Sequence, residues 1–176
     1  MFVRVSDDGG ATWGAAQKAG ESAETYAQEP HVLVDPHNRV HVVWSEGGGW
    51  GPRVALWHAV SRSADLAEAG VSWTSSAMPL HDRLTRTKAA IDRCGTVHVV
   101  FEVWSGQRID IGYARFGNAG WSSIIKPFDK LGGMPSLAVG DDVIHLVWDR
   151  ILRKGDPKTR TPIQTEAVHS TLAVSG

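Results

Sequence analysis

The chain has 176 residues, 42% hydrophobic and 21% charged, which is enough apolar material to bury the core of one globular domain. Eighteen basic residues nearly balance nineteen acidic ones, and a formal charge of -1 argues against a nucleic-acid or membrane-surface partner. One cysteine excludes an internal disulfide, and neither a leader peptide nor a membrane-spanning apolar run is predicted, so the compartment stays open.

The first predicted element is a hairpin over residues 2–18, whose turn carries the sequence SDDGGATW. Three later segments then share one pattern, in which a short apolar run, a polar turn and a second apolar run precede an aromatic residue and an acid. Runs of about four to eight apolar residues, rich in Val and Ile and bounded by Gly, Pro and Asp, predict β-strands. These segments are PHVLVDPHNRVHVVWSE (30–46), TKAAIDRCGTVHVVFEV (87–103) and PSLAVGDDVIHLVWDR (135–150).

The first two of these segments are followed by a third strand-like run, over residues 53–61 and 109–116, and by a glycine-containing turn that ends in tryptophan. After the last segment, residues 166–174 have the same strand-like character. Four short strands in a repeat of about 40 to 50 residues are typical of a β-propeller blade. The sequence therefore predicts one all-β domain over 1–176, a partial propeller of about three blades with repeats at about 2–18, 30–80, 87–128 and 134–175.

One histidine recurs at the same place in the three segments, as His41, His98 and His145. Because the three lie on different blades, we expect them to pack between blades through hydrogen bonds and not to share a metal ion. No Cys and His cluster has the spacing of a zinc site. The sequence therefore predicts no metal and no cofactor.

The turn of the first hairpin resembles the Asp box of the BNR repeats found in sialidase-like propellers. Aspartate and serine side chains bond to the backbone of a tight turn, and glycine there accepts positive φ. We therefore expect Asp8 to be structural, and the tryptophans at the three such turns, Trp13, Trp73 and Trp121, to be buried. The residues that carry the resemblance are Ser6, Asp8, Gly10, Thr12 and Trp13.

In an antiparallel meander, the Asp-box turn lies at the same end as the turns at 35–38, 92–95 and 140–142. The longer loops lie at the opposite end, where binding residues concentrate on rigid scaffolds. Arginine binds carboxylates and aromatic faces stack on sugar rings, so a carbohydrate ligand is expected there. Three acids that follow second strands form an expected set with nearby arginines and tryptophans. The candidate ligand-binding residues are Glu46, Trp50, Arg53, Glu102, Trp104, Arg108, Asp149 and Arg150.

Two functions follow from this reading. A non-catalytic module that binds glycan or a protein partner is favoured, because it needs only stacking aromatics and hydrogen bonds. The alternative, implied by the resemblance, is a sialidase-type exo-glycosidase, or a fragment of one, acting on an anionic sugar. Such enzymes use an arginine triad, a tyrosine nucleophile and an acidic acid/base. The Phe/Tyr-Arg-Ile-Pro motif of that family is absent, and no motif gives Tyr26 or Tyr113 a glutamate partner.

The strand count predicts how the ring closes. The chain starts with a third and fourth strand, contains two complete blades, and ends with the first two or three strands of another. Propellers close with about 4 to 8 blades. We expect a homodimer in which residues 134–150 of each copy complete a blade with residues 2–18 of the other, giving six blades under two-fold symmetry. The alternative is a fragment of a longer single-chain propeller.

Overall fold

The computed structural model describes residues 1–21, 26–47, 53–63, 66, 71–80, 82–106, 108–126, 132–140, 143–153 and 164–173. This described part contains β-strands and no helix, which confirms the all-β class, and so no helix in it could span a bilayer. The strands are β1 (Phe2–Val3), β2 (Gln17–Lys18), β3 (Ala27–Val34), β4 (Val40–Gly47), β5 (Arg53–Ser61), β6 (Trp73–Pro79), β7 (Arg83–Ile91), β8 (Val97–Ser105), β9 (Arg108–Gly117), β10 (Gly120–Trp121), β11 (Gly132–Val139), β12 (Val143–Arg153) and β13 (Gln164–Ala173).

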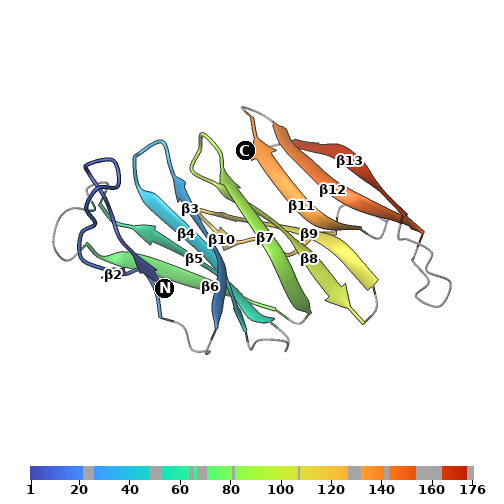
Figure 1. The fold of residues 1–176 in the computed structure, drawn as a ribbon, viewed down its shortest axis with the longest axis horizontal. Helices are drawn as coiled ribbons and strands as arrows, with labels where there is room; N and C mark the ends of the chain where they lie inside the picture. Colours follow the sequence, from blue (N-terminus) through green and yellow to red (C-terminus); the bar gives the residue numbers. More distant parts are fainter. Residues whose placement is uncertain are drawn as a thin grey trace.

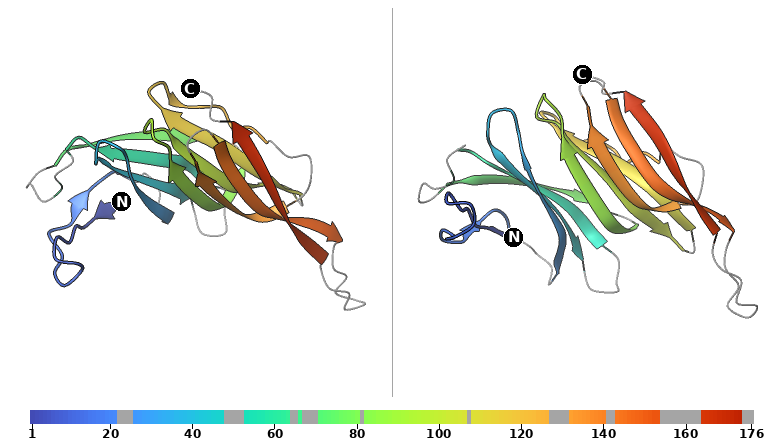
Figure 2. Two further views of the ribbon diagram at one scale, coloured as in Figure 1. Left: turned by 90° about the horizontal axis from the view of Figure 1, so that it is seen from above. Right: turned by 45° about the horizontal axis from the view of Figure 1, so that its top comes forward.

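The strands form four antiparallel sheets in which each strand pairs with its neighbour in sequence. We call them the N-terminal hairpin (β1–β2), the first sheet (β3–β6), the second sheet (β7–β10) and the C-terminal sheet (β11–β13). They follow one another along the long axis of the molecule (Figure 1), and from above they trace an open arc (Figure 2). Successive four-stranded meanders packed face to face are compatible with a β-propeller-like fold.

The core consists of apolar layers between successive sheets. Side chains alternate along β4, so Val42 and Trp44 pack towards the N-terminal hairpin while Val43 packs towards the second sheet. On β8, Phe101 packs towards the first sheet and Val100 towards the C-terminal sheet. Because both faces of these strands are covered, their sequences are almost continuously hydrophobic and do not alternate with polar residues.

The second sheet tolerates no side chain at Gly112. A Cβ there would lie 2.7 Å from Cγ2 of Val103 and closer still to the ring of Phe101, which is fully buried. We predict that Gly112→Ala lowers the free energy of unfolding by about 1–3 kcal/mol, the usual effect of overpacking a core. Urea unfolding would measure it. Gly117→Ala is the matched control, because its nearest neighbour lies 3.8 Å away, and an equal loss in both variants would contradict the packing argument.

The turn of the N-terminal hairpin is held by the side chains of Asp8 and Ser6. The backbone N–H and hydroxyl of Thr12 donate to the two carboxylate oxygens of Asp8 at 2.9 and 2.6 Å, and the N–H of Gly10 donates to Oγ of Ser6 at 2.7 Å. Hydrogen bonds from Thr12, and a further one from Ser6, hold the pKa of Asp8 well below its usual range. Gly10 has φ 94°, a conformation that favours glycine.

These bonds lead to a local prediction. Asp8→Ala removes the acceptor of the Thr12 amide, so that amide should lose its protection against hydrogen exchange, as should that of Gly10 in the same turn. Amides in the buried strand β8 should keep their protection, because the turn is exposed and remote from it. Hydrogen exchange followed by NMR tests this. Unchanged protection of the Thr12 amide would contradict the role given to Asp8.

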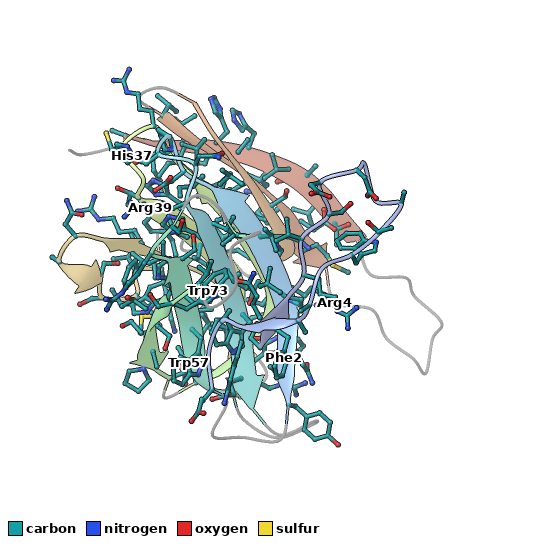
Figure 3. All side chains as sticks on the ribbon, turned by 90° about the vertical axis from the view of Figure 1, so that its left-hand side faces the viewer. Phe2, Arg4, His37, Arg39, Trp57 and Trp73 are labelled. Carbon is teal, nitrogen blue, oxygen red and sulfur yellow. The ribbon has the colours of Figure 1, made fainter. Side chains whose placement is uncertain are left out.

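The predicted burial of Trp13 is wrong, since its side chain is 59% exposed, and Trp73 and Trp121 are only partly buried. Trp121 packs against the preceding sheet, where its indole N–H donates to the carbonyl of Ser76 at 3.4 Å. Trp73 likewise packs in the layer beneath the N-terminal hairpin, on the end of the arc that faces the viewer in Figure 3. No described sheet precedes that hairpin, so Trp13 has no equivalent surface to cover it.

Two of the recurring histidines, His41 and His98, belong to short buried chains of polar groups. In the first sheet, His41 contacts Oδ2 of Asp35 through Nε2 at 3.3 Å and Nε2 of His58 through Nδ1 at 2.9 Å. His58 then stacks on Phe116 of the second sheet, with ring centroids 4.0 Å apart. His98 makes the corresponding contacts in the second sheet. His41 and His98 are buried and bonded, but these bonds join groups of one sheet and are not the expected bonds between blades, and His145 is exposed.

Candidate binding groove

The first strand of each larger sheet carries a β-bulge at the same place. The pairing registers shift between Gln28 and His31 in β3, Thr85 and Lys88 in β7, and Gly133 and Ser136 in β11. A bulge bends the strand and redirects a side chain. In each case the residue that begins the bulge has a left-handed backbone, which is uncommon for any residue but glycine. These residues are Glu29 (φ 55°), Arg86 (φ 55°) and Met134 (φ 53°).

The three bulges line one groove of about 540 Å³. Strands β3, β7 and β11 are edge strands of their sheets and lie side by side, so each contributes a short segment to the groove wall. Arg86 and Lys88 supply positive charge, while Pro30, Met134 and Pro135 supply apolar surface. The full lining is Glu29, Pro30, His31, Arg86, Thr87, Lys88, Met134, Pro135 and Ser136.

Glu102 lies fully buried behind this groove and is surrounded by donors. Nη1 of Arg86 donates to both carboxylate oxygens at 2.8 and 2.7 Å, and the hydroxyl of Thr85 donates at 3.0 Å. The indole N–H of Trp104 contributes a bond of 3.1 Å, and the backbone N–H of Met134 in the next sheet one of 2.8 Å. A buried carboxylate is tolerated when it is paired and bonded in this way.

Glu29 plays a similar part between the first and second sheets. Its carboxylate accepts the backbone N–H of Arg86 at 2.8 Å and that of Thr87 at 3.0 Å. Across the same boundary, Nε2 of His31 lies 2.7 Å from the carbonyl of Thr87. The groove is therefore built by bonds that tie each bulge to the neighbouring sheet, and they fix the position of Arg86.

The three acids expected to form one set do not occupy equivalent positions. Ser45, Glu102 and Asp149 are equivalent, because they pair with Gln28, Thr85 and Gly133 just before the three bulges. Glu46 is one residue further along and so points to the opposite face of its sheet. There it is buried, and its Oε2 accepts the indole N–H of Trp57 at 2.8 Å.

The other expected residues divide between several places. Trp104 joins Glu102, and the guanidinium of Arg83 lies 5.6 Å from its ring centroid. Arg108 is tied to the buried carboxylate of Asp110 at 2.6 Å, and Arg150 pairs with Glu166 on β13. Asp149 is half-buried on β12. Trp50 and the side chain of Arg53 lie outside the described residues. The structure thus brings together only Glu102 and Trp104.

Sequence reasoning places Glu29 and Arg86 in the loops at the expected binding end but does not select them as binding residues, and it does not name Lys88 or Met134. A signal was present in the prolines that follow Glu29 and Met134 and begin two of the predicted segments. Proline removes a ladder donor, and within sheets it is found mainly at edges and bulges. Two prolines at equivalent places in two repeats therefore predict bulged edge strands lying side by side.

A second polar cluster has the outline of a catalytic triad. His98 contacts Oδ2 of Asp92 through Nε2 at 3.1 Å and the hydroxyl of Tyr113 through Nδ1 at 2.7 Å. Burial raises the pKa of Tyr113 and lowers that of His98, so the hydroxyl stays protonated and the imidazole neutral. The same chain recurs as Asp35, His41 and His58, which favours a structural role for both.

Within the described ranges, no group of three or more His, Cys, Asp or Glu residues could hold a metal ion. Comparison with models of known protein families, with curated proteins and with solved structures gave no match.

Proposed function

We propose that the protein is a non-catalytic binding module that takes a carbohydrate in the groove formed by β3, β7 and β11. The observation that carries the proposal is the convergence of three equivalent bulges on one groove with mixed lining. Arg86 and Lys88 offer charged donors to the hydroxyl or carboxylate groups of a sugar. Pro30, Met134 and Pro135 offer apolar surface to the C–H faces of its ring.

The carboxylates of the groove favour binding over hydrolysis. Glycosidases of most kinds need two acidic groups free to exchange protons or attack the sugar. Here Glu102 is saturated by Arg86, Thr85, Trp104 and Met134, and Glu29 accepts two backbone amides. Release of either carboxylate would break the bonds between sheets.

The test is a glycan array probed with the wild-type chain and two charge-reversal variants. Lys88→Glu places a carboxylate in the groove and should reduce binding of the retained glycans at least about tenfold. Arg4→Glu is the matched control, because Arg4 is exposed on the N-terminal hairpin (Figure 3), and it should bind like the wild type. Equal binding by all three proteins would remove the groove from the proposal. Turnover of a fluorogenic sialoside by the wild type would contradict the non-catalytic proposal and support a glycosidase instead.

The finer assignment of the fold belongs to the same proposal. We propose a sialidase-like propeller of the BNR type, with the arc closed to about six blades by a second copy. The Asp-box turn and the meander of successive sheets support this assignment. β13 pairs along the whole of β12, from Val143 to Arg153, and so holds the third position of its sheet. The N-terminal hairpin of a second copy would therefore join that sheet at its outer edge, beyond β13.

A further inference from the structure

Three valines occupy one position on the second strands of the larger sheets. Val43, Val100 and Val147 each follow a recurring histidine by two residues. Val43 and Val100 point towards the next sheet along the arc, and Val147 occupies the equivalent position on the C-terminal sheet. Val43 and Val100 are fully buried, whereas Val147 is 44% exposed. The valine that is buried in the two preceding sheets is therefore exposed on the C-terminal sheet.

The internal contacts show what covers such a valine. Val43 belongs to an apolar cluster with Ala89 and Ile91 of β7, and Val100 to one with Leu137 and Val139 of β11. Counted from the bulges, the equivalent pair on β3 is Val32 and Val34. These two are 62% and 51% exposed. Both surfaces that would form one more contact between sheets are therefore exposed, one on β12 and the other on β3.

A polar feature repeats beside each apolar contact. An acid of one sheet accepts a hydrogen bond from the backbone N–H of the bulge in the next sheet. Glu29 accepts the N–H of Arg86, and Glu102 accepts the N–H of Met134. On β12 the position equivalent to Glu102 is Asp149, which pairs with Gly133 as Glu102 pairs with Thr85. Among the described residues, only the two-stranded N-terminal hairpin precedes the bulge of Glu29 on β3.

We infer that a second copy of this chain covers these surfaces, with Val147 of one copy packed against Val32 and Val34 of the other. In the same contact Asp149 accepts the backbone N–H of Glu29. The inference rests on the proposed closure of the ring by a second copy and names the residues that close it. β3 and β12 lie towards opposite ends of the arc (Figure 1), so the contact is head to tail, and two such contacts close a dimer.

The experiment is light scattering on the full chain and on four folded variants. The wild type should have about twice the chain mass of 19.0 kDa. Val32→Glu and Val147→Glu should each weaken self-association at least about tenfold, because each buries an unpaired charge. The double variant Val32→Lys with Val147→Glu should recover the dimer, since both contacts then pair opposite charges. Ile125→Glu is the matched control, because Ile125 is 47% exposed and lies on neither surface.

The outcomes separate the two proposals. A monomeric wild type at high micromolar concentration would overturn both this contact and the closure by a second copy. A dimer that survives Val32→Glu and Val147→Glu would overturn the contact while leaving closure in place. Loss of the dimer in the single variants and its return in the double variant would support the contact. Glycan binding is measured independently, so its failure would leave these results interpretable.

Discussion

Replacing Glu102 with alanine should lower the free energy of unfolding by about 1–3 kcal/mol, the usual cost of leaving buried donors without their acceptor. Glu102 is fully buried, and its loss leaves Arg86, Thr85 and the backbone N–H of Met134 without their acceptor. Because Met134 lies in the next sheet, the variant also removes a bond that holds two sheets together. Urea unfolding at neutral pH would measure the change.

Glu21→Ala is the matched control for this variant. Glu21 also forms an ion pair, with Lys18, but its side chain is 83% exposed. Exposed pairs of this kind contribute about 0–1 kcal/mol, so its removal should change the stability little. A loss in Glu102→Ala no larger than that in the control would show that Glu102 does not organise the groove.

Acidification from pH 7.5 to 5.0 should destabilise the protein by at least about 2 kcal/mol. Burial, reinforced by the nearby His41, lowers the pKa of His58 from 6.5 to about 3. The unfolded chain therefore binds a proton near pH 6.5 that the folded chain refuses until about pH 3, and stability is lost as the pH falls between these values. Between pH 6.5 and 5.0 the free energy of unfolding therefore falls by about 1.4 kcal/mol for each of about 1.5 pH units. Burial also lowers the pKa of His41 and His98, which acts in the same direction.

Urea unfolding of variants at both pH values isolates this effect. His58→Phe keeps an aromatic ring against Phe116 but cannot titrate, so it should be less stable than the wild type at pH 7.5 and show a flatter pH dependence. His37→Gln is the control, because His37 is exposed in a turn and should leave the dependence unchanged. A His58→Phe variant with the full wild-type dependence would contradict the assignment to the buried chain.

The class and strand order could be predicted because they follow from patterns that repeat along the chain. Strands buried on both faces have nearly continuous apolar runs, and the second strands of the larger sheets contain them, as in VHVVW before Ser45 and VHVVF before Glu102. The turn at Asp8 was readable for a similar reason, since its bonds join residues at most four apart.

The groove was not predicted, because it depends on bulges that shift register by one residue. Glu46 was grouped with Glu102 because both are acids, although Ser45 has the same spacing from its histidine as Glu102 has. A difference of one residue places a side chain on the other face of a sheet. The exposure of Trp13 depends on a neighbouring sheet, which local sequence does not encode. The partnership of Glu29 with Arg86 joins residues 57 apart and follows only from the packing of one sheet on the next.

The most direct test of the proposed site is a map of amide shifts in ¹H–¹⁵N spectra while a glycan retained on the array is titrated into the protein. Binding in the groove should move the amides of Arg86, Thr87, Lys88 and Ser136, which line it on two different sheets. The amides of Gly10 and Thr12, in the hairpin turn, should not move. Shifts confined to the hairpin or to the turns at 35–38 and 92–95, with none along β7, would contradict the assignment of the site.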